Sequence, residues 1–189
     1  MMAILPATPG QTIGPFYGFA LPFDHGADLV SPGSPGSIHV HGTVFDGAGV
    51  PVPDALLEIW QADAQGTVPT APGSLRRDGW TFTGWGRTGT DGAGRYGFTT
   101  VKPAAVKADS APFIAMTVFA RGLLDRLFTR VYLPDDRIAT DGLLAGLPPS
   151  RRATLIAVPD ENGLRFDVRL QAGPDGQAET VFLRHRVNG

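Results

Sequence analysis

His39 and His41 are the residues whose type and spacing most directly suggest chemistry. They stand two positions apart in a run, 38–45, that is typical of a β-strand, so both side chains are expected on one face of it. Two imidazoles on one face could chelate a metal ion. A metal site needs more ligands, and the other two histidines, His25 and His185, stand far away in the sequence. We therefore favour the alternative that the pair faces solvent or another subunit, and keep a metalloenzyme as the second possibility.

Other patterns that could carry chemistry are weaker. Glu58 and Trp60 share a strand face, where one carboxylate beside a tryptophan is more often a structural group than an acid catalyst. The segment 84–89 matches the dinucleotide-binding glycine pattern, but the residues after it predict a hairpin turn instead of a helix. No G-x-S-x-G sequence is present to support a serine hydrolase. Nucleotide binding and serine hydrolysis are therefore not predicted.

Trp80, Phe82 and Trp85 form an aromatic cluster in a turn-rich region. Such a cluster could be a platform for a ligand, or a small satellite core beneath a loop. The second interpretation is favoured.

The elements that must position these residues are predicted to be strands. Apolar runs or alternating apolar and polar residues, separated by turn residues, indicate strands at 38–45, 55–61, 81–87, 95–101, 113–120, 127–133, 164–170 and 180–183. The segment 150–157 is predicted to be a helix with Ser150 as its N-cap. We expect an all-β fold, an antiparallel β-sandwich with an extended N-terminal arm (1–36) and at most one or two short helices, in a single domain whose sandwich covers 37–189.

Composition excludes several classes of protein. The 25 glycines and 17 prolines are too many for a helix-rich chain, while 42% hydrophobic residues argue against disorder. A net charge of -2 without runs of like charge argues against nucleic acid as a partner. No run approaches the roughly 18 apolar residues of a membrane span, and the absence of cysteine excludes disulfides and thiolate chemistry. We expect a cytoplasmic protein.

Six separated segments together resemble the intradiol ring-cleavage dioxygenases, and the protocatechuate 3,4-dioxygenases among them. These segments are 8–17 (TPGQTIGPFY), 42–46 (GTVFD), 51–54 (PVPD) with 57–66 (LEIWQADAQG), 86–88 (GRT), 100–103 (TVKP) and 165–168 (RFDV). They occur in the family's order and cover nearly the whole chain. The resemblance implies a β-sandwich core, in agreement with the strand pattern.

The resemblance also implies where iron ligands should be. Active members hold Fe(III) with two tyrosines and two histidines, since phenolates are hard ligands that stabilise the ferric ion. The matching positions here are Val68, Val106, Phe113 and Ala115. None of these side chains can bind iron, so no metal site and no catalytic residue is expected in this chain.

Family members that keep the fold without the ligands resemble α subunits, which pair with an iron-bearing β subunit of the same fold. The resemblance implies an oxidoreductase of aromatic catabolism, in the β-ketoadipate pathway, and a hetero-oligomer of αβ units. Its Fe(III) would be bound by the partner β subunit, which would cleave protocatechuate with dioxygen to 3-carboxy-cis,cis-muconate. The α subunit would be inactive alone and would shape the substrate pocket.

Residue by residue, the resemblance implies that the pocket wall includes Thr12, Gly14, Pro15 and Phe16, with Arg121 as a cation near the substrate carboxylate. Phe16 departs from the tyrosine expected there. Arg121 could instead form a structural ion pair at a subunit interface, and Arg130 is a second candidate cation. The alternative function is a β-sandwich module that binds carbohydrate or peptide without enzymatic activity.

Overall fold

The run Ser37–Phe45 forms β1, the central strand of one sheet in the computed structural model, which describes residues 16–70, 77–78, 80–174 and 176–184. Val40 and Val44 are fully buried on its inner face, whereas His39 is exposed on the other. The alternation follows from the two-residue period of a strand. One face of the sheet is therefore apolar and must be covered.

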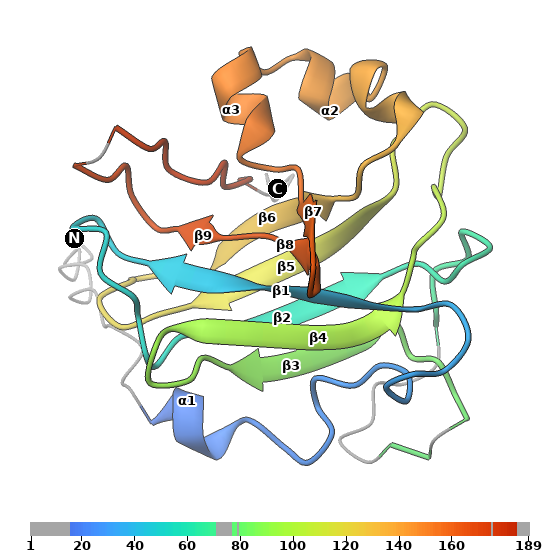
Figure 1. The fold of residues 1–189 in the computed structure, drawn as a ribbon, viewed down its shortest axis with the longest axis horizontal. Coiled ribbons are helices and arrows are strands. Elements are labelled where there is room, and N and C mark those ends of the chain that lie inside the picture. The colour runs from blue at the N-terminus through green and yellow to red at the C-terminus, as the bar shows by residue number, and fades with distance from the viewer. Residues whose placement is uncertain (1–15, 71–76, 79, 175, 185–189) are drawn as a thin grey trace, which may run out of the picture.

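Two sheets pack face to face (Figure 1). The first has the order β4-β1-β8-β7, with β9 also pairing with β1, and consists of β4 (Arg95–Val101), β1, β8 (Gly163–Arg165), β7 (Val158–Asp160) and β9 (Val168–Arg169). The second has the order β3-β2-β5-β6 and consists of β3 (Trp85–Gly89), β2 (Leu56–Gln61), β5 (Phe113–Phe119) and β6 (Leu127–Tyr132). The predicted all-β sandwich is confirmed. Its pairing is antiparallel except where β8 and β9 run parallel to β1.

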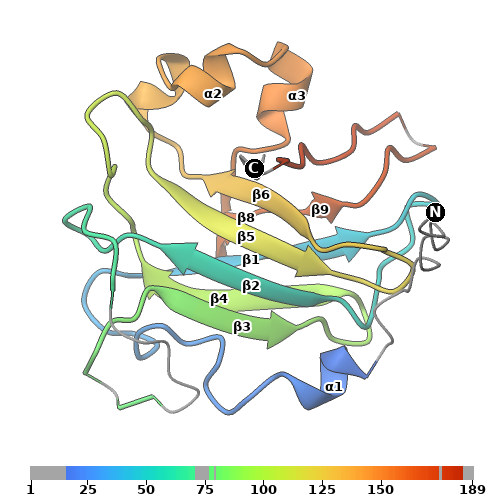
Figure 2. The ribbon, with the colours of Figure 1, turned by 180° about the vertical axis from the view of Figure 1, so that it is seen from behind.

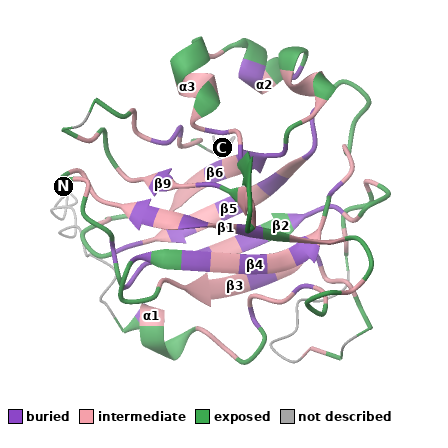
Figure 3. Cartoon of the chain, in the orientation of Figure 1, coloured by how far each residue is buried: buried purple, intermediate pink, exposed green. Residues whose placement is uncertain are grey.

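The core lies between the sheets. Phe98 of β4, Ile59 of β2 and Met116 of β5 belong to one buried cluster with Val40 and Val44. Figure 3 shows the resulting alternation of buried and less buried residues along the strands. The opposite face of the second sheet points outward, and this outer face carries the candidate site.

Helices are short and more numerous than expected. In the described residues α1 is Tyr17–Ala20, η1 is the 3₁₀ turn Asp136–Ala139, α2 is Gly142–Ala145 and α3 is Pro149–Ala153. The predicted helix at 150–157 is thus shorter, and Pro148 takes the N-cap position assigned to Ser150. It ends early because residues 155–157 pair with Tyr132: the Tyr132 N–H donates to the Leu155 carbonyl, and the Ala157 N–H donates to the Tyr132 carbonyl. Figure 2 shows α2 and α3 beyond the β6 edge.

Three predicted strands differ from those observed. The one at 81–87 begins only at Trp85, because Gly84 has a φ of 65° and turns the chain. The one at 164–170 is divided because the backbone of Phe166 bonds to His41 and Tyr96 between β8 and β9. The one at 180–183 forms no regular strand, since its N–H groups bond first to Arg169 on one sheet and then to Phe128 on the other. Each difference arises from tertiary contacts.

The described part of the N-terminal arm runs along the edge strands of both sheets. Its Gly26 carbonyl accepts a hydrogen bond from Arg87 on β3, and its Leu29 N–H donates to Thr99 on β4. Beside these bonds α1 lies at the bottom of Figure 1. The arm therefore closes one side of the sandwich. Among the described residues, no helix has the length and apolarity needed to cross a membrane.

Candidate functional site

The four positions at which iron ligands were expected, Val68, Val106, Phe113 and Ala115, line one cavity of about 450 Å³. Val68 and Val106 come from the loops after β2 and β4, and Phe113 and Ala115 from β5. In Figure 2 these loops lie at the left end of the molecule, beyond the second sheet. Residues up to 47 positions apart in the sequence (68 and 115) therefore share one site.

The floor of the cavity is the outer face of the second sheet. Ala115 on β5 is directly opposite Trp60 on β2 and Arg130 on β6, so these three side chains form one row across three strands. Phe113, two residues before Ala115, shares the same face. The register of the sheet thus places a tryptophan, a phenylalanine and an arginine in one cavity.

Arg130 is held in place by an aromatic ring and a phenol. Its guanidinium carbon lies 4.0 Å from the Phe113 ring centre, and its Nη1 donates to the Tyr132 hydroxyl at 3.1 Å. Tyr132 in turn donates to Asp141 at 3.3 Å. Burial raises the pKa of Tyr132, while Arg130 lowers it less. The phenol therefore stays neutral and acts as a fixed bridge.

Asp141 was not recognised in the sequence as a site residue. Its Oδ1 caps α2 by accepting from the N–H groups of Leu143 and Leu144, and its Oδ2 accepts from Ala111. The signal available was an Asp directly before Gly142 and an apolar run, the pattern of an N-cap. Its charge is thus committed to the backbone.

The side chains at the four expected ligand positions cannot hold a ferric ion. Two valines, a phenylalanine and an alanine have no atom that coordinates iron. Within the described ranges there is also no group of three or more His, Asp or Glu side chains that could hold a metal. No catalytic step through iron is therefore assigned to this chain.

His39 and His41 lie on one face of β1, as their spacing indicates. Their rings stack 5.2 Å apart, His41 Nε2 lies 3.0 Å from Asp160 Oδ1, and His39 Nδ1 lies 3.0 Å from the Asn162 carbonyl oxygen. The hydrogen bond with His41 holds the pKa of Asp160 below its usual value. Both rings thus attach the β7–β8 hairpin to β1.

Arg121 lies at the other end of the second sheet. It follows β5, whose seven residues at about 3.3 Å each separate it from the cavity by roughly 20 Å. Its Nε donates to the Asp54 carboxylate, 2.8 Å from Oδ2, and its side chain is 63% exposed against 6% for Asp54. Arg121 therefore pairs with an acidic residue of its own chain, whereas the ion pair considered from the sequence was one at a subunit interface.

The arm meets Arg121 at this end. Tyr17 packs against Phe119, and its pKa is raised to about 12 by burial and then by Asp54, against an opposing effect of Arg121. Phe16, beside it, is 81% exposed. Thr12, Gly14 and Pro15 lie outside the described residues. Of the predicted pocket-wall residues, Phe16 and Arg121 are thus the two that the structure describes, on the same end of the molecule.

Glu58 and the segment 84–89 have structural partners. Glu58 Oε1 accepts from Arg87 Nη2 at 2.6 Å and from Nε at 2.8 Å across the β2–β3 pair. Residues Trp85–Gly89 form β3 and precede a turn, so the glycine pattern begins no helix. These observations agree with the structural interpretation of both.

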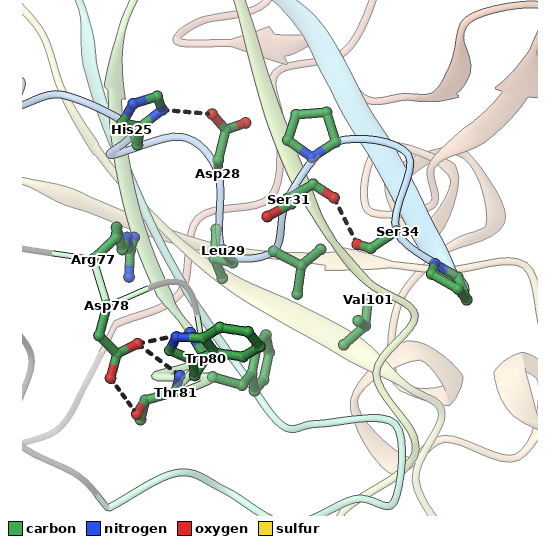
Figure 4. Close-up of a pocket in the computed structure, with 14 residues that line it drawn as sticks. His25, Asp28, Leu29, Ser31, Ser34, Arg77, Asp78, Trp80, Thr81 and Val101 are labelled. Atoms are coloured by element: carbon green, nitrogen blue, oxygen red, sulfur yellow. Dashed lines mark hydrogen bonds and ion pairs between the residues drawn. The ribbon is translucent and has the colours of Figure 1, made fainter.

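The three aromatic residues at 80–85 do not form one platform. Trp85 stacks on Phe23 at 5.7 Å, Phe82 packs against the core, and Trp80 is 93% exposed. Trp80 and Phe82 line a separate cavity of about 690 Å³ (Figure 4). Its wall includes Asp78, whose carboxylate accepts from Thr81 and so has a pKa lowered to about 2. Of the three aromatic residues, only Trp80 is thus highly exposed at this cavity, and the three rings do not gather into one cluster.

Comparison with known proteins supplies the context for these sites. The sequence model of the family described as Dioxygenase matches residues 13–172. The protocatechuate 3,4-dioxygenase alpha chain of Burkholderia cepacia is 42% identical over 96% of this chain and 99% of its own length. The beta chain of that organism's enzyme is 34% identical over 72% of this chain and 63% of its own.

A solved structure shares the fold. It is the dioxygenase domain of a dioxygenase and carbohydrate-binding protein fusion from Streptomyces sp. SirexAA-E. Its TM-score is 0.54 at 26% identity, over 76% of this chain and 84% of that one.

Proposed function

The chain belongs to the dioxygenase family, and we infer that it is the non-catalytic α subunit of a protocatechuate 3,4-dioxygenase. The observation that supports the proposal is that Val68, Val106, Phe113 and Ala115, the residues at the four expected ligand positions, line one cavity. The family is iron-dependent, and these side chains cannot bind iron. Fe(III) and the ring cleavage of protocatechuate by dioxygen are therefore assigned to a β subunit of the same fold.

The role proposed for this chain is to complete the partner's substrate pocket. Thr12, Gly14, Pro15 and Phe16 of the arm would form part of the wall, and Arg121 would bind the substrate carboxylate. The described geometry supports this in two ways. Phe16 and Arg121 lie at the end of the sheet away from the chain's own cavity, and the Arg121 side chain remains mostly exposed although Nε binds Asp54. Asp54 would hold the Arg121 guanidinium at Nε, and the exposed N–H groups of the same guanidinium would face the substrate.

Co-expression tests the subunit assignment. We expect this chain to purify with a partner that carries two tyrosines and two histidines at the four expected ligand positions. The purified complex should contain one iron ion per partner chain. The chain purified without the partner should contain no iron and consume no oxygen with protocatechuate. A stable monomer that binds a carbohydrate or peptide would favour the binding-module alternative, and iron with oxygen uptake in the isolated chain would exclude the proposed role.

Arg121→Ala in the complex tests the pocket assignment. Loss of a charge-assisted bond to the carboxylate should raise the KM for protocatechuate by about tenfold, with a smaller change in kcat. Arg151→Ala is the matched control, because Arg151 on α3 pairs with Glu179 and carries the same charge. An unchanged KM in Arg121→Ala, with the complex intact, would leave Arg121 as a structural partner of Asp54 alone.

A further inference from the structure

The cavity on the outer face of the second sheet gathers exposed apolar side chains. Trp60 is 52% exposed, Val68 38% and Val106 49%, and all three line it. Its volume of about 450 Å³ lies within the usual range for small-molecule sites, roughly 300–1,000 Å³. Large apolar side chains that stay exposed around a hollow of this size favour a ligand that covers them. The cavity walls therefore favour a ligand with an apolar part that packs against these three side chains.

The cavity also contains a fixed cation. Arg130 lies over Phe113 and donates through Nη1 to Tyr132. Among the described residues, no carboxylate forms an ion pair with this guanidinium. A guanidinium held by a ring face and a phenol can still bind a carboxylate through two N–H groups.

The nearest carboxylate does not cancel this charge directly. Asp141 is 2% exposed and accepts three backbone hydrogen bonds, from Ala111, Leu143 and Leu144, in addition to the Tyr132 hydroxyl. Lys107 and Asp109 are exposed at the rim and carry opposite charges. The interior of the cavity therefore favours an anion at Arg130.

The remaining wall offers little to a hydroxylated ring. Gln61 is bonded to Ala62 and Val101 through its amide nitrogen and to Thr100 through its oxygen. Ser110 donates to the Lys107 carbonyl. Val68, Val106 and Ala115, which also line the cavity, have no side-chain group that can form a hydrogen bond. A ring hydroxyl placed against these three side chains would lose its water without gaining a hydrogen-bond partner, which weakens binding.

We propose that this cavity is a binding site, without turnover, for aromatic monocarboxylates that lack ring hydroxyls, such as benzoate. The carboxylate binds Arg130, and the ring lies among Trp60, Val68 and Val106. The selectivity follows from the chain's own residues, so the proposal stands independently of the subunit assignment.

The position of the ligand is tested by crystallography of the full-length chain, in whatever assembly it purifies. Crystals soaked with 4-iodobenzoate should show an anomalous iodine peak inside the cavity, with the carboxylate directed to Arg130. A cavity without the peak, at a soak concentration that saturates binding in solution, would overturn the proposal. Because the peak locates each bound molecule, a benzoate bound to a partner subunit is not confused with one bound here.

Variants test the two halves of the site. Arg130→Gln removes the cation, and Val106→Trp fills the ring position from an exposed loop residue without touching any charged group. Calorimetric titration with benzoate should show one site fewer per chain in both variants. Arg126→Gln is the matched control, since Arg126 lies over Phe128 at 5.1 Å outside the cavity and should leave the number of sites unchanged. Retention of the full number of sites in folded Arg130→Gln and Val106→Trp would contradict the proposal.

Competition tests the selectivity. An equal concentration of benzoate should weaken the iodine peak in the cavity, whereas 3,4-dihydroxybenzoate should require at least about tenfold more, the effect of one unpaired hydroxyl. If 3,4-dihydroxybenzoate displaces the iodo compound as well as benzoate does, the cavity does not select against ring hydroxyls and the proposal is wrong.

Discussion

The Tyr17 phenol is buried beside the Arg121–Asp54 ion pair, with no hydrogen-bond partner in the described part of the chain. Its pKa rises to about 12 from about 10 in the unfolded chain. The unfolded state therefore loses its proton first, so this group's contribution to stability is complete below pH 10 and is lost as pH rises toward 12.

Tyr17→Phe should remove this pH dependence. Relative to the variant, the wild-type protein should lose about 1 kcal/mol of unfolding free energy between about pH 8 and about pH 11. Denaturant unfolding at both pH values measures this difference. The other buried tyrosines, Tyr96 and Tyr132, are present in both proteins, so their contributions to the pH dependence cancel in the difference. Equal losses in the two proteins would contradict a raised pKa at Tyr17.

At the scale of elements, the close approach of β1 to the segment between β8 and β9 depends on Gly42. A Cβ at this position would overlap the backbone carbonyl of Phe166, which Tyr96 and the strand contacts hold in place. Gly42→Ala should therefore destabilise the fold by about 3 kcal/mol.

Gly142→Ala is the matched control for this substitution. Gly142 has no atom within 4 Å of its would-be Cβ and lies in α2, so alanine should stabilise by about 0.5 kcal/mol. Thermal unfolding of both variants measures the contrast. Similar changes in both would show that β1 and Phe166 do not pack as closely as described.

At the scale of the whole molecule, the two ends of the second sheet have different expected roles. Phe16 and Phe19 are about four-fifths exposed at the Arg121 end, and Leu124 follows nearby in the chain at 66%. Hydrogen exchange of the complex against the chain alone should show new protection at 16–21 and 120–126. The loop 104–110 beside the cavity should change little. Protection confined to the cavity end would place the partner on the wrong side of the molecule for the proposed pocket.

Some elements were predicted from the sequence better than others. The apolar runs bounded by turn residues predicted strands where β1, β2 and β5 are found, because the preference for an extended backbone is a local property of these residues. The segments 164–170 and 180–183 were predicted less well, since their backbone partners lie on other strands. The same applies to Asp54, whose pairing with Arg121 connects residues 67 positions apart.

The sequence by itself determined most strands of the sandwich and the residue types at the four expected ligand positions, since both are properties of the chain's own order. Only the tertiary structure decided that these four positions meet in one cavity, that Arg130 lies there, and that Arg121 lies at the far end of β5. Strand register and loop packing bring distant residues together, and both depend on interactions across the whole molecule.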